Sequence, residues 1–119
     1  MEIHFKHLDE EVPKAVQDRV DRKLTKLEEL LGHAARNAHA YIEISRASGA
    51  HQNGQIWQAI LNLDADGKRY NSHANGDSPH KASDKALYEL RQEVRKARNK
   101  IQSQVKHSRP SWRSIFLGA

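Results

Sequence analysis

Residues 82–105 read ASDKALYELRQEVRKARNKIQSQV, and the apolar residues of this stretch recur every three or four positions. They are Ala82, Ala86, Leu90, Val94, Ala97, Ile101 and Val105. Because an α-helix turns once in about 3.6 residues, this spacing gathers all of them on one face. The stretch therefore predicts a long amphipathic helix, which Ser108-Arg109-Pro110 is expected to end.

Three stretches ahead of this helix alternate apolar and polar residues, which is the pattern of strands with one buried face. They are residues 40–44, 57–63 and 70–74, the last being the most polar. Asp64-Ala65-Asp66-Gly67 lies between the second and third stretches and predicts a hairpin turn. Trp57 begins the apolar face of the second stretch, so we expect its side chain in the core.

The first part of the chain predicts one more strand and one more helix. Ile3 and Phe5 alternate with polar residues, and apolar residues at helical spacing then run from Val16 to Leu31, before Gly32. The predicted order is β-α-β-β-β-α, an α+β fold with both helices packed on one face of a four-stranded sheet. This arrangement resembles a double-stranded-RNA-binding domain. The other sheet face is predicted to be solvated and to carry Glu43, Gln58, Asn62 and His73.

Length and composition exclude several classes of protein. A chain of 119 residues has room for one core, and we expect one domain over residues 1–107 with a short tail over residues 108–119. The absence of cysteine excludes a disulfide scaffold, a thiol nucleophile and a Cys-ligated metal. No apolar run approaches the roughly 18 residues of a membrane helix, and the N-terminus does not read as a secretory signal. A cytoplasmic protein that does not associate with membranes is expected.

Positive charge is concentrated in the second half of the chain. Residues 1–64 hold 8 Lys and Arg against 10 Asp and Glu, whereas residues 65–119 hold 12 against 5. Helical projection places basic residues on one flank of the first helix and on the side of the last helix away from its apolar stripe. These candidate RNA-binding residues are Arg22, Lys23, Lys26, Lys81, Lys85, Arg91, Arg95 and Arg98.

If the two helices pack side by side with these basic flanks adjacent, the flanks merge into one cationic surface. Such a surface would bind phosphates with salt-sensitive affinity, because each phosphate contact releases a counterion. The alternative is that both charged faces are simply solvated. The segregation of sign on two helices favours a polyanionic partner, and nucleic acid is the commonest one.

Catalytic and cofactor motifs are missing from the sequence. No phosphate-binding glycine loop, HExxH motif or nucleophile elbow is present, and the eight histidines are scattered without metal-ligand spacing. We therefore expect no enzymatic activity, no metal site, no cofactor and no small-molecule substrate. Tyr41 and Tyr70 are ambiguous, since an aromatic residue on a strand either packs in the core or stacks on RNA bases.

Two segments resemble a known family. The first is Val12-Pro13-Lys14-Ala15-Val16 followed by Val20-Asp21-Arg22-Lys23-Leu24-Thr25-Lys26-Leu27-Glu28. The second runs from Gly76-Asp77 into Ala82, Ala86, Leu87, Leu90 and the basic series Arg91, Arg95, Lys96, Arg98. Together with the element order, they resemble the ribosome hibernation-promoting factors over residues 1–106. This family includes ribosome-associated inhibitor A (protein Y), and its members were formerly called sigma-54 modulation proteins.

The resemblance implies a function. Such proteins bind the decoding region of the 30S subunit through 16S rRNA, in 30S or 70S ribosomes. They inhibit translation by blocking the mRNA and tRNA sites under stress or in stationary phase. The basic residues of both helices would then meet rRNA phosphates, and the chain would be a monomer off the ribosome.

Some features depart from the family or leave alternatives open. Pro79-His80 stands where the family often has an aromatic residue. The tail over residues 108–119 has no match in the family. It could lie in the mRNA channel, pack on the sheet, or be partly disordered. One alternative function is a general double-stranded RNA-binding module. Another is a protein-interaction domain of the sigma-54 modulation type that uses the apolar tail.

Overall fold

The computed structural model describes the backbone of residues 1–47 and 56–117, and the side chains of residues 1–47 and 56–100. The strands are β1 (Glu2–Leu8), β2 (His39–Arg46), β3 (Trp57–Ala65) and β4 (Lys68–Gly76). The helices are α1 (Lys14–Lys26), α2 (Glu28–Leu31), the 3-10 helix η1 (Gly32–Asn37) and α3 (Pro79–Leu117). Because α2 and η1 are short turns that follow α1, the predicted β-α-β-β-β-α order is confirmed.

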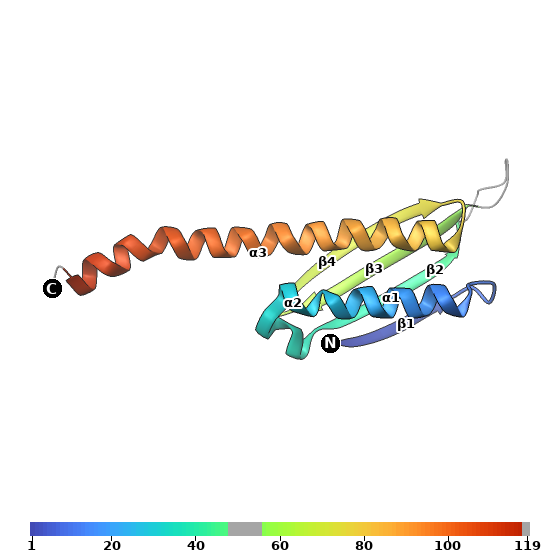
Figure 1. Ribbon diagram of the computed structural model, residues 1–119, viewed down its shortest axis with the longest axis horizontal. Helices are drawn as coiled ribbons and strands as arrows, with labels where there is room; N and C mark the ends of the chain where they lie inside the picture. Colours follow the sequence, from blue (N-terminus) through green and yellow to red (C-terminus); the bar gives the residue numbers. More distant parts are fainter. Residues whose placement is uncertain (48–55, 118–119) are drawn as a thin grey trace.

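The sheet has the strand order β1-β2-β3-β4. Strands β1 and β2 are parallel, and the other two pairs are antiparallel. The β3–β4 hairpin turns at Asp66 and Gly67, both with positive φ, as a two-residue turn of type I′ requires. Both long helices lie on one face of the sheet, as predicted (Figure 1).

The core lies between the sheet and these two helices. Helix α1 contributes Val20 and Leu24, which are fully buried beneath it. Trp57 is 4% exposed, so its predicted place in the core is confirmed. Fully buried residues on the strands and α3 include Ile42, Ile44, Ala59, Leu61, Leu63, Ala82, Ala86, Leu90 and Val94.

Helix α3 begins at Pro79 and sits close to the sheet. The Lys81 backbone N–H donates to Ser78 Oγ at 3.1 Å, and Pro79 is the first helical residue. The Ser72 hydroxyl on β4 donates to the Ala86 carbonyl at 2.8 Å, so strand and helix are joined directly. A Cβ on Gly76 would lie 2.6 Å from the Ala82 nitrogen, so only glycine fits this approach.

Two predicted helix boundaries differ from the structure. The first helical pattern is interrupted at Leu27, whose N–H bonds to the Leu24 carbonyl, although Leu27 and Leu31 stay buried. The predicted end of the last helix at Ser108-Arg109-Pro110 is wrong, because α3 continues to Leu117. A proline removes one backbone donor and bends a helix without always ending it, and α3 bends in its C-terminal part (Figure 1).

The far side of the sheet carries polar side chains in rows across the strands. Asn71 donates to the Asn62 side-chain oxygen at 2.6 Å between β4 and β3. His73 is exposed, and Glu43, Gln58 and Asn62 are only half-buried, so the prediction of a polar sheet face is confirmed. Among the described residues, none of the helices has the length and apolar character to cross a bilayer. The division into a domain over residues 1–107 and a tail stays a prediction.

Candidate nucleic-acid interface

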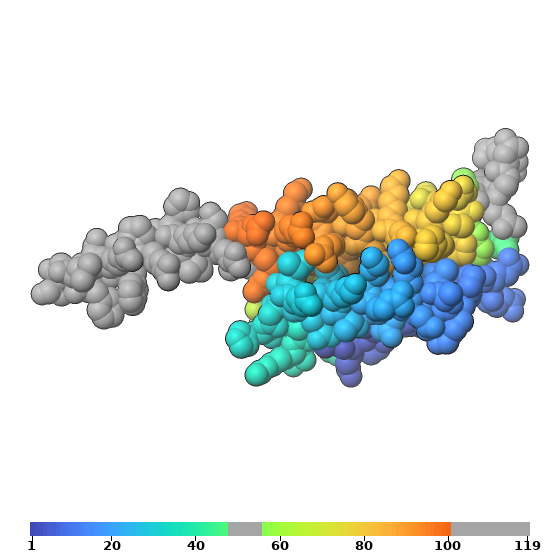
Figure 2. Space-filling view, in the orientation of Figure 1, coloured from blue at the N-terminus to red at the C-terminus, as the bar shows by residue number. Residues whose placement is uncertain are grey.

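A groove of about 630 Å³ runs between α1 and α3 on the helical side of the molecule. The two helices lie side by side on this face (Figure 2). Its lining is Arg19, Lys23, Lys26, Leu27, Glu29, Asp84, Leu87, Tyr88 and Arg91. Leu27 and Leu87 are buried, so the floor is apolar and the charged residues form the walls.

Three of the predicted RNA-binding residues meet at this groove: Lys23 and Lys26 from α1, and Arg91 from α3. Their positions follow from the helical period. Lys23 and Lys26 adjoin the buried Leu24 and Leu27, so they project from the flank of α1 toward α3. These three cations therefore line one groove, and their role in RNA binding stays a prediction.

Four other predicted residues are exposed but do not line the groove. They are Arg22 on α1 and Lys81, Lys85 and Arg95 on α3. Lys81 is partly neutralised, because its Nζ lies 3.3 Å from the Asp77 carboxylate. These residues surround the groove on the outer surfaces of both helices and extend its positive charge.

Arg98 differs from the other predicted residues, because its side chain is half-buried and the others are exposed. Its guanidinium would lie 4.0 Å from a Cβ built on Gly32, so it leans toward the start of η1. Burial raises the pKa of the Tyr70 hydroxyl, and the nearby Arg98 charge opposes that rise. Arg98 therefore lies between α3, η1 and β4, where little of it is free for RNA.

The most important contact that helical projection does not predict is the ion pair between Arg19 and Asp84. The Arg19 Nε lies 2.8 Å from Asp84 Oδ1. The hydrogen bond to Asp84, together with its charge, raises the pKa of the Arg19 guanidinium. His80 Nε2 lies 3.3 Å from the other Asp84 oxygen. The pair joins the two groove walls and neutralises one of the cations there.

Several cations around the groove have no such partner. Within residues 1–47 and 56–100, no carboxylate oxygen lies within 4.0 Å of Arg22, Lys23, Lys26, Lys85, Arg91 or Arg95. An unpaired surface cation binds a phosphate without first breaking an ion pair. The arrangement therefore suits a polyanion with a phosphate backbone.

Tyr88 is the aromatic residue of the groove, and it is 61% exposed. Tyr88 is not among the residues predicted from the sequence, although the helical period puts it on the side of α3 that carries Lys85 and Arg91. The two tyrosines considered in the sequence are less available: Tyr70 is 7% exposed, and the Tyr41 ring is stacked on His4 and His39 on the opposite side of the sheet. An exposed aromatic ring among cations is a feature of surfaces that stack nucleic-acid bases.

Comparison with known proteins adds to this geometry. The model of a family described as sigma 54 modulation protein / S30EA ribosomal protein matches residues 1–102. The N-terminal domain of Thermus thermophilus Protein Y is 19% identical, with a TM-score of 0.59 over 80% of this chain and 93% of that chain. A ribosomal subunit interface protein from Coxiella burnetii is 16% identical, with a TM-score of 0.57 over 82% of this chain and 96% of that chain. No curated protein matches the sequence. At these identities, the two solved structures establish the fold.

Proposed function

The chain belongs to the sigma 54 modulation protein / S30EA ribosomal protein family, and we propose that it is a ribosome hibernation factor. It binds the decoding region of the 30S subunit through 16S rRNA, in 30S or 70S ribosomes. Translation stops because the protein occupies the sites of mRNA and tRNA. The action is steric and not enzymatic, and it needs no cofactor.

The observation that carries this proposal is the convergence of Lys23, Lys26 and Arg91 on one groove from two different helices. Each of these side chains is exposed. Each cation that neutralises a phosphate releases counterions, and this supplies affinity without reading base sequence. Specificity then comes from shape, because two rigid helices hold the cations at positions that only a matching rRNA surface satisfies.

The names of the two structural neighbours agree with this assignment. One is a Protein Y domain and the other is called a ribosomal subunit interface protein. The resemblance of both helices to hibernation-promoting factors rests on residues that include Lys23 and Arg91. Ribosome binding therefore has support from family membership and from the charge of the groove.

Co-sedimentation with purified 30S and 70S ribosomes tests the proposal. The protein is mixed with ribosomes across a salt series, with duplex RNA as a competitor. We expect stoichiometric pelleting that survives the competitor and weakens with salt. Failure to pellet would contradict ribosome binding, and loss of binding to any duplex RNA would favour a general double-stranded RNA-binding module.

A charge-reversal variant tests whether the groove is the contact surface. We expect Lys23→Glu, Lys26→Glu and Arg91→Glu together to abolish pelleting at near-physiological salt. The matched control reverses the exposed Lys6, Arg36 and Lys68, which lie outside the groove lining. The control has the same net charge, so equal loss of binding in both variants would indicate a nonspecific charge effect and contradict the groove assignment.

Chemical footprinting of 16S rRNA tests the location. We expect protection in the decoding region. In a purified translation system we expect the wild-type protein to inhibit translation, and adding it to reactions that contain the triple variant should restore inhibition. Stoichiometric binding with protection elsewhere would keep ribosome binding but refute the decoding-site mechanism.

A further inference from the structure

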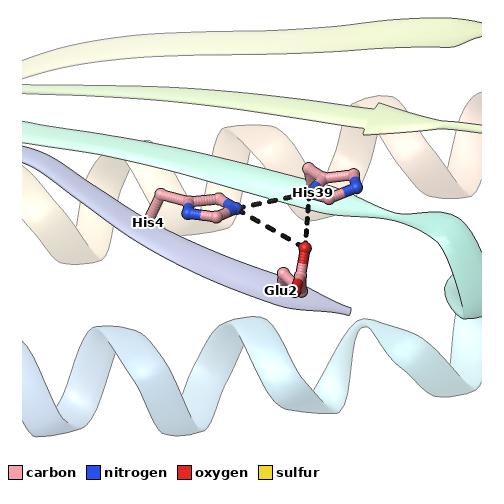
Figure 3. A group of neighbouring side chains, drawn as sticks. All are labelled: Glu2, His4 and His39. Atoms are coloured by element: carbon pink, nitrogen blue, oxygen red, sulfur yellow. Dashed lines mark hydrogen bonds and ion pairs between the residues drawn. The ribbon is translucent and has the colours of Figure 1, made fainter.

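A second cluster of chemically active side chains lies on the polar face of the sheet. Glu2 and His4 on β1 and His39 on β2 point toward one another (Figure 3). His39 Nδ1 lies 3.1 Å from Glu2 Oε2 and 3.3 Å from His4 Nε2. His4 Nε2 lies 4.0 Å from Glu2 Oε2. Three donor atoms therefore form a small triangle at the surface.

Strand geometry explains this cluster. Glu2 and His4 are two residues apart on β1, so their side chains share a face. The parallel register pairs Glu2 with His39, which places the second imidazole beside the first. The neighbouring Ala40 and Ile42 are buried under the helices, so His39 faces the other side of the sheet. This face is opposite the groove.

Aromatic packing holds the two imidazoles in place. The Tyr41 ring stacks on His4 at 5.1 Å between centroids and on His39 at 6.4 Å. The two imidazoles are themselves 5.5 Å apart, with their planes inclined by 14°. The cluster is therefore ordered before any ligand arrives, which lowers the entropy cost of binding.

We propose that Glu2, His4 and His39 bind a divalent transition-metal ion of the zinc class. Two imidazoles and one carboxylate are a common donor set for zinc, whereas magnesium and calcium prefer oxygen ligands. Two ligands about 2.1 Å from zinc at a tetrahedral angle lie about 3.4 Å apart. The three observed separations, 3.1, 3.3 and 4.0 Å, are close to that spacing, so small side-chain rotations complete the site.

The surroundings set the properties of this site. Asp64 pairs with His39 across β2 and β3, but its carboxylate accepts two hydrogen bonds from Arg69 at 2.6 and 2.7 Å. Asp64 is therefore already paired with Arg69, and the described residues supply only three ligands. The side chains of Glu2, His4 and His39 are 69%, 41% and 39% exposed, so water reaches the remaining coordination position. We expect micromolar affinity, because the ligands are partly solvated.

Calorimetric titration of the untagged, metal-free protein with zinc chloride near neutral pH tests the proposal. An affinity tag is excluded, because a polyhistidine tag would bind zinc itself. We expect one ion per chain, and His4→Ala and His39→Ala should each weaken binding by at least about tenfold. The matched control is His73→Ala, since His73 is exposed on the same sheet face outside the cluster, and it should bind zinc like the wild type.

Glu2→Gln keeps the test independent of folding, since this side chain is 69% exposed and its loss cannot disrupt the core. We expect it to weaken zinc binding by about three- to tenfold. In NMR spectra, zinc should shift the ring signals of His4 and His39 but leave those of His73 in place. No binding at millimolar zinc, or equal binding by wild type, His4→Ala and His39→Ala, would overturn the proposal. These measurements need no ribosome, so they stand apart from the proposed function.

Discussion

Arg19 on α1 donates two hydrogen bonds to Asp84 on α3, from Nε to Oδ1 at 2.8 Å and from Nη2 to Oδ2 at 3.3 Å. This bidentate pair bridges the two walls of the groove, from positions 65 residues apart in the chain. We expect it to have two opposing effects on the proposed RNA binding. It fixes one helix against the other, and it removes positive charge from a surface that we propose to contact phosphates.

Asp84→Asn separates these two effects, because the amide keeps the shape but loses the charge. Both side chains are about a third exposed, so we expect the free energy of unfolding to fall by no more than about 1 kcal/mol. Ribosome affinity at low salt should rise by roughly two- to fivefold, since Arg19 is released for phosphate. Urea unfolding measures the free energy of unfolding, and co-sedimentation measures the ribosome affinity. Asp18→Asn is the control, on the outer side of α1. Weaker ribosome binding by Asp84→Asn would mean that the pair mainly positions the helices.

Lys85→Glu with Arg95→Glu tests the basic surface outside the groove. Both residues are exposed on α3, so we expect unfolding free energy to change by less than about 1 kcal/mol. Ribosome affinity near physiological salt should fall by at least about tenfold, and the dependence of log affinity on log salt should become shallower by about 1.5. Lys6→Glu with Lys68→Glu makes the same charge change on the sheet and is the control. Retained binding by the α3 variant would refute a contact role for this part of the surface.

The elements of the fold are predictable from the sequence because burial follows local periodicity. Val20 and Leu24 repeat at helical spacing and are fully buried. Ile42 and Ile44 alternate with polar residues along their strand and are also fully buried. The end of α3 is different, because one proline competes with a long run of helical hydrogen bonds. A local rule for Pro110 therefore predicts a boundary that the helix does not have.

The candidate site is predictable only where helical projection suffices. Helical projection places Lys23 on a flank of α1 and Arg91 on the side of α3 away from its apolar stripe, because each is fixed by its own buried stripe. That both line one groove follows from how the two helices pack. Pairing of Arg19 with Asp84 and the half-burial of Arg98 depend on how helices and η1 pack against one another. The cluster around His39 depends on the register of β1 with β2, and residue spacing along the chain does not determine that register.

Gly76→Ala should destabilise the junction between β4 and α3. The added Cβ would meet the Ala82 nitrogen at 2.6 Å, and this backbone cannot rotate away as a side chain would. We expect a loss of about 1–3 kcal/mol in unfolding free energy, as for other overpacked sites. Gly67→Ala is the comparison: it has open space around it, and its positive φ alone should cost about 1 kcal/mol. Urea denaturation of both variants measures these losses. If Gly76→Ala lost the same or less unfolding free energy than Gly67→Ala, the start of the helix would be shown to shift freely.

Asp64 should contribute to the acid dependence of stability. The Arg69 hydrogen bond lowers the pKa of the Asp64 carboxyl in the folded chain. The unfolded chain therefore binds this proton at higher pH than the folded chain does. The contribution is present above the unfolded pKa of about 4, and it is lost as pH falls through the lower folded value. Asp64→Asn should flatten the rise of unfolding free energy with pH across that acid window. The same slope in both proteins would contradict the prediction.

Tyr88 tests whether the groove binds bases as well as phosphates. Tyr88 is 61% exposed beside unpaired cations, so Tyr88→Ala removes only the smaller, buried part of its surface and should change the unfolding free energy by less than about 1 kcal/mol. If an rRNA base stacks on the ring, affinity should fall by about 1–3 kcal/mol. The salt dependence should stay as in the wild type, because no ionic contact is lost.

Tyr88→Phe is the control, since it keeps the aromatic face and loses only the hydroxyl. We expect it to bind ribosomes like the wild type in the same salt series. Equal loss in Tyr88→Ala and Tyr88→Phe would mean that the hydroxyl makes the contact. Wild-type binding by both variants would mean that the groove recognises its partner by charge and shape alone, with Lys23, Lys26 and Arg91 supplying the contacts.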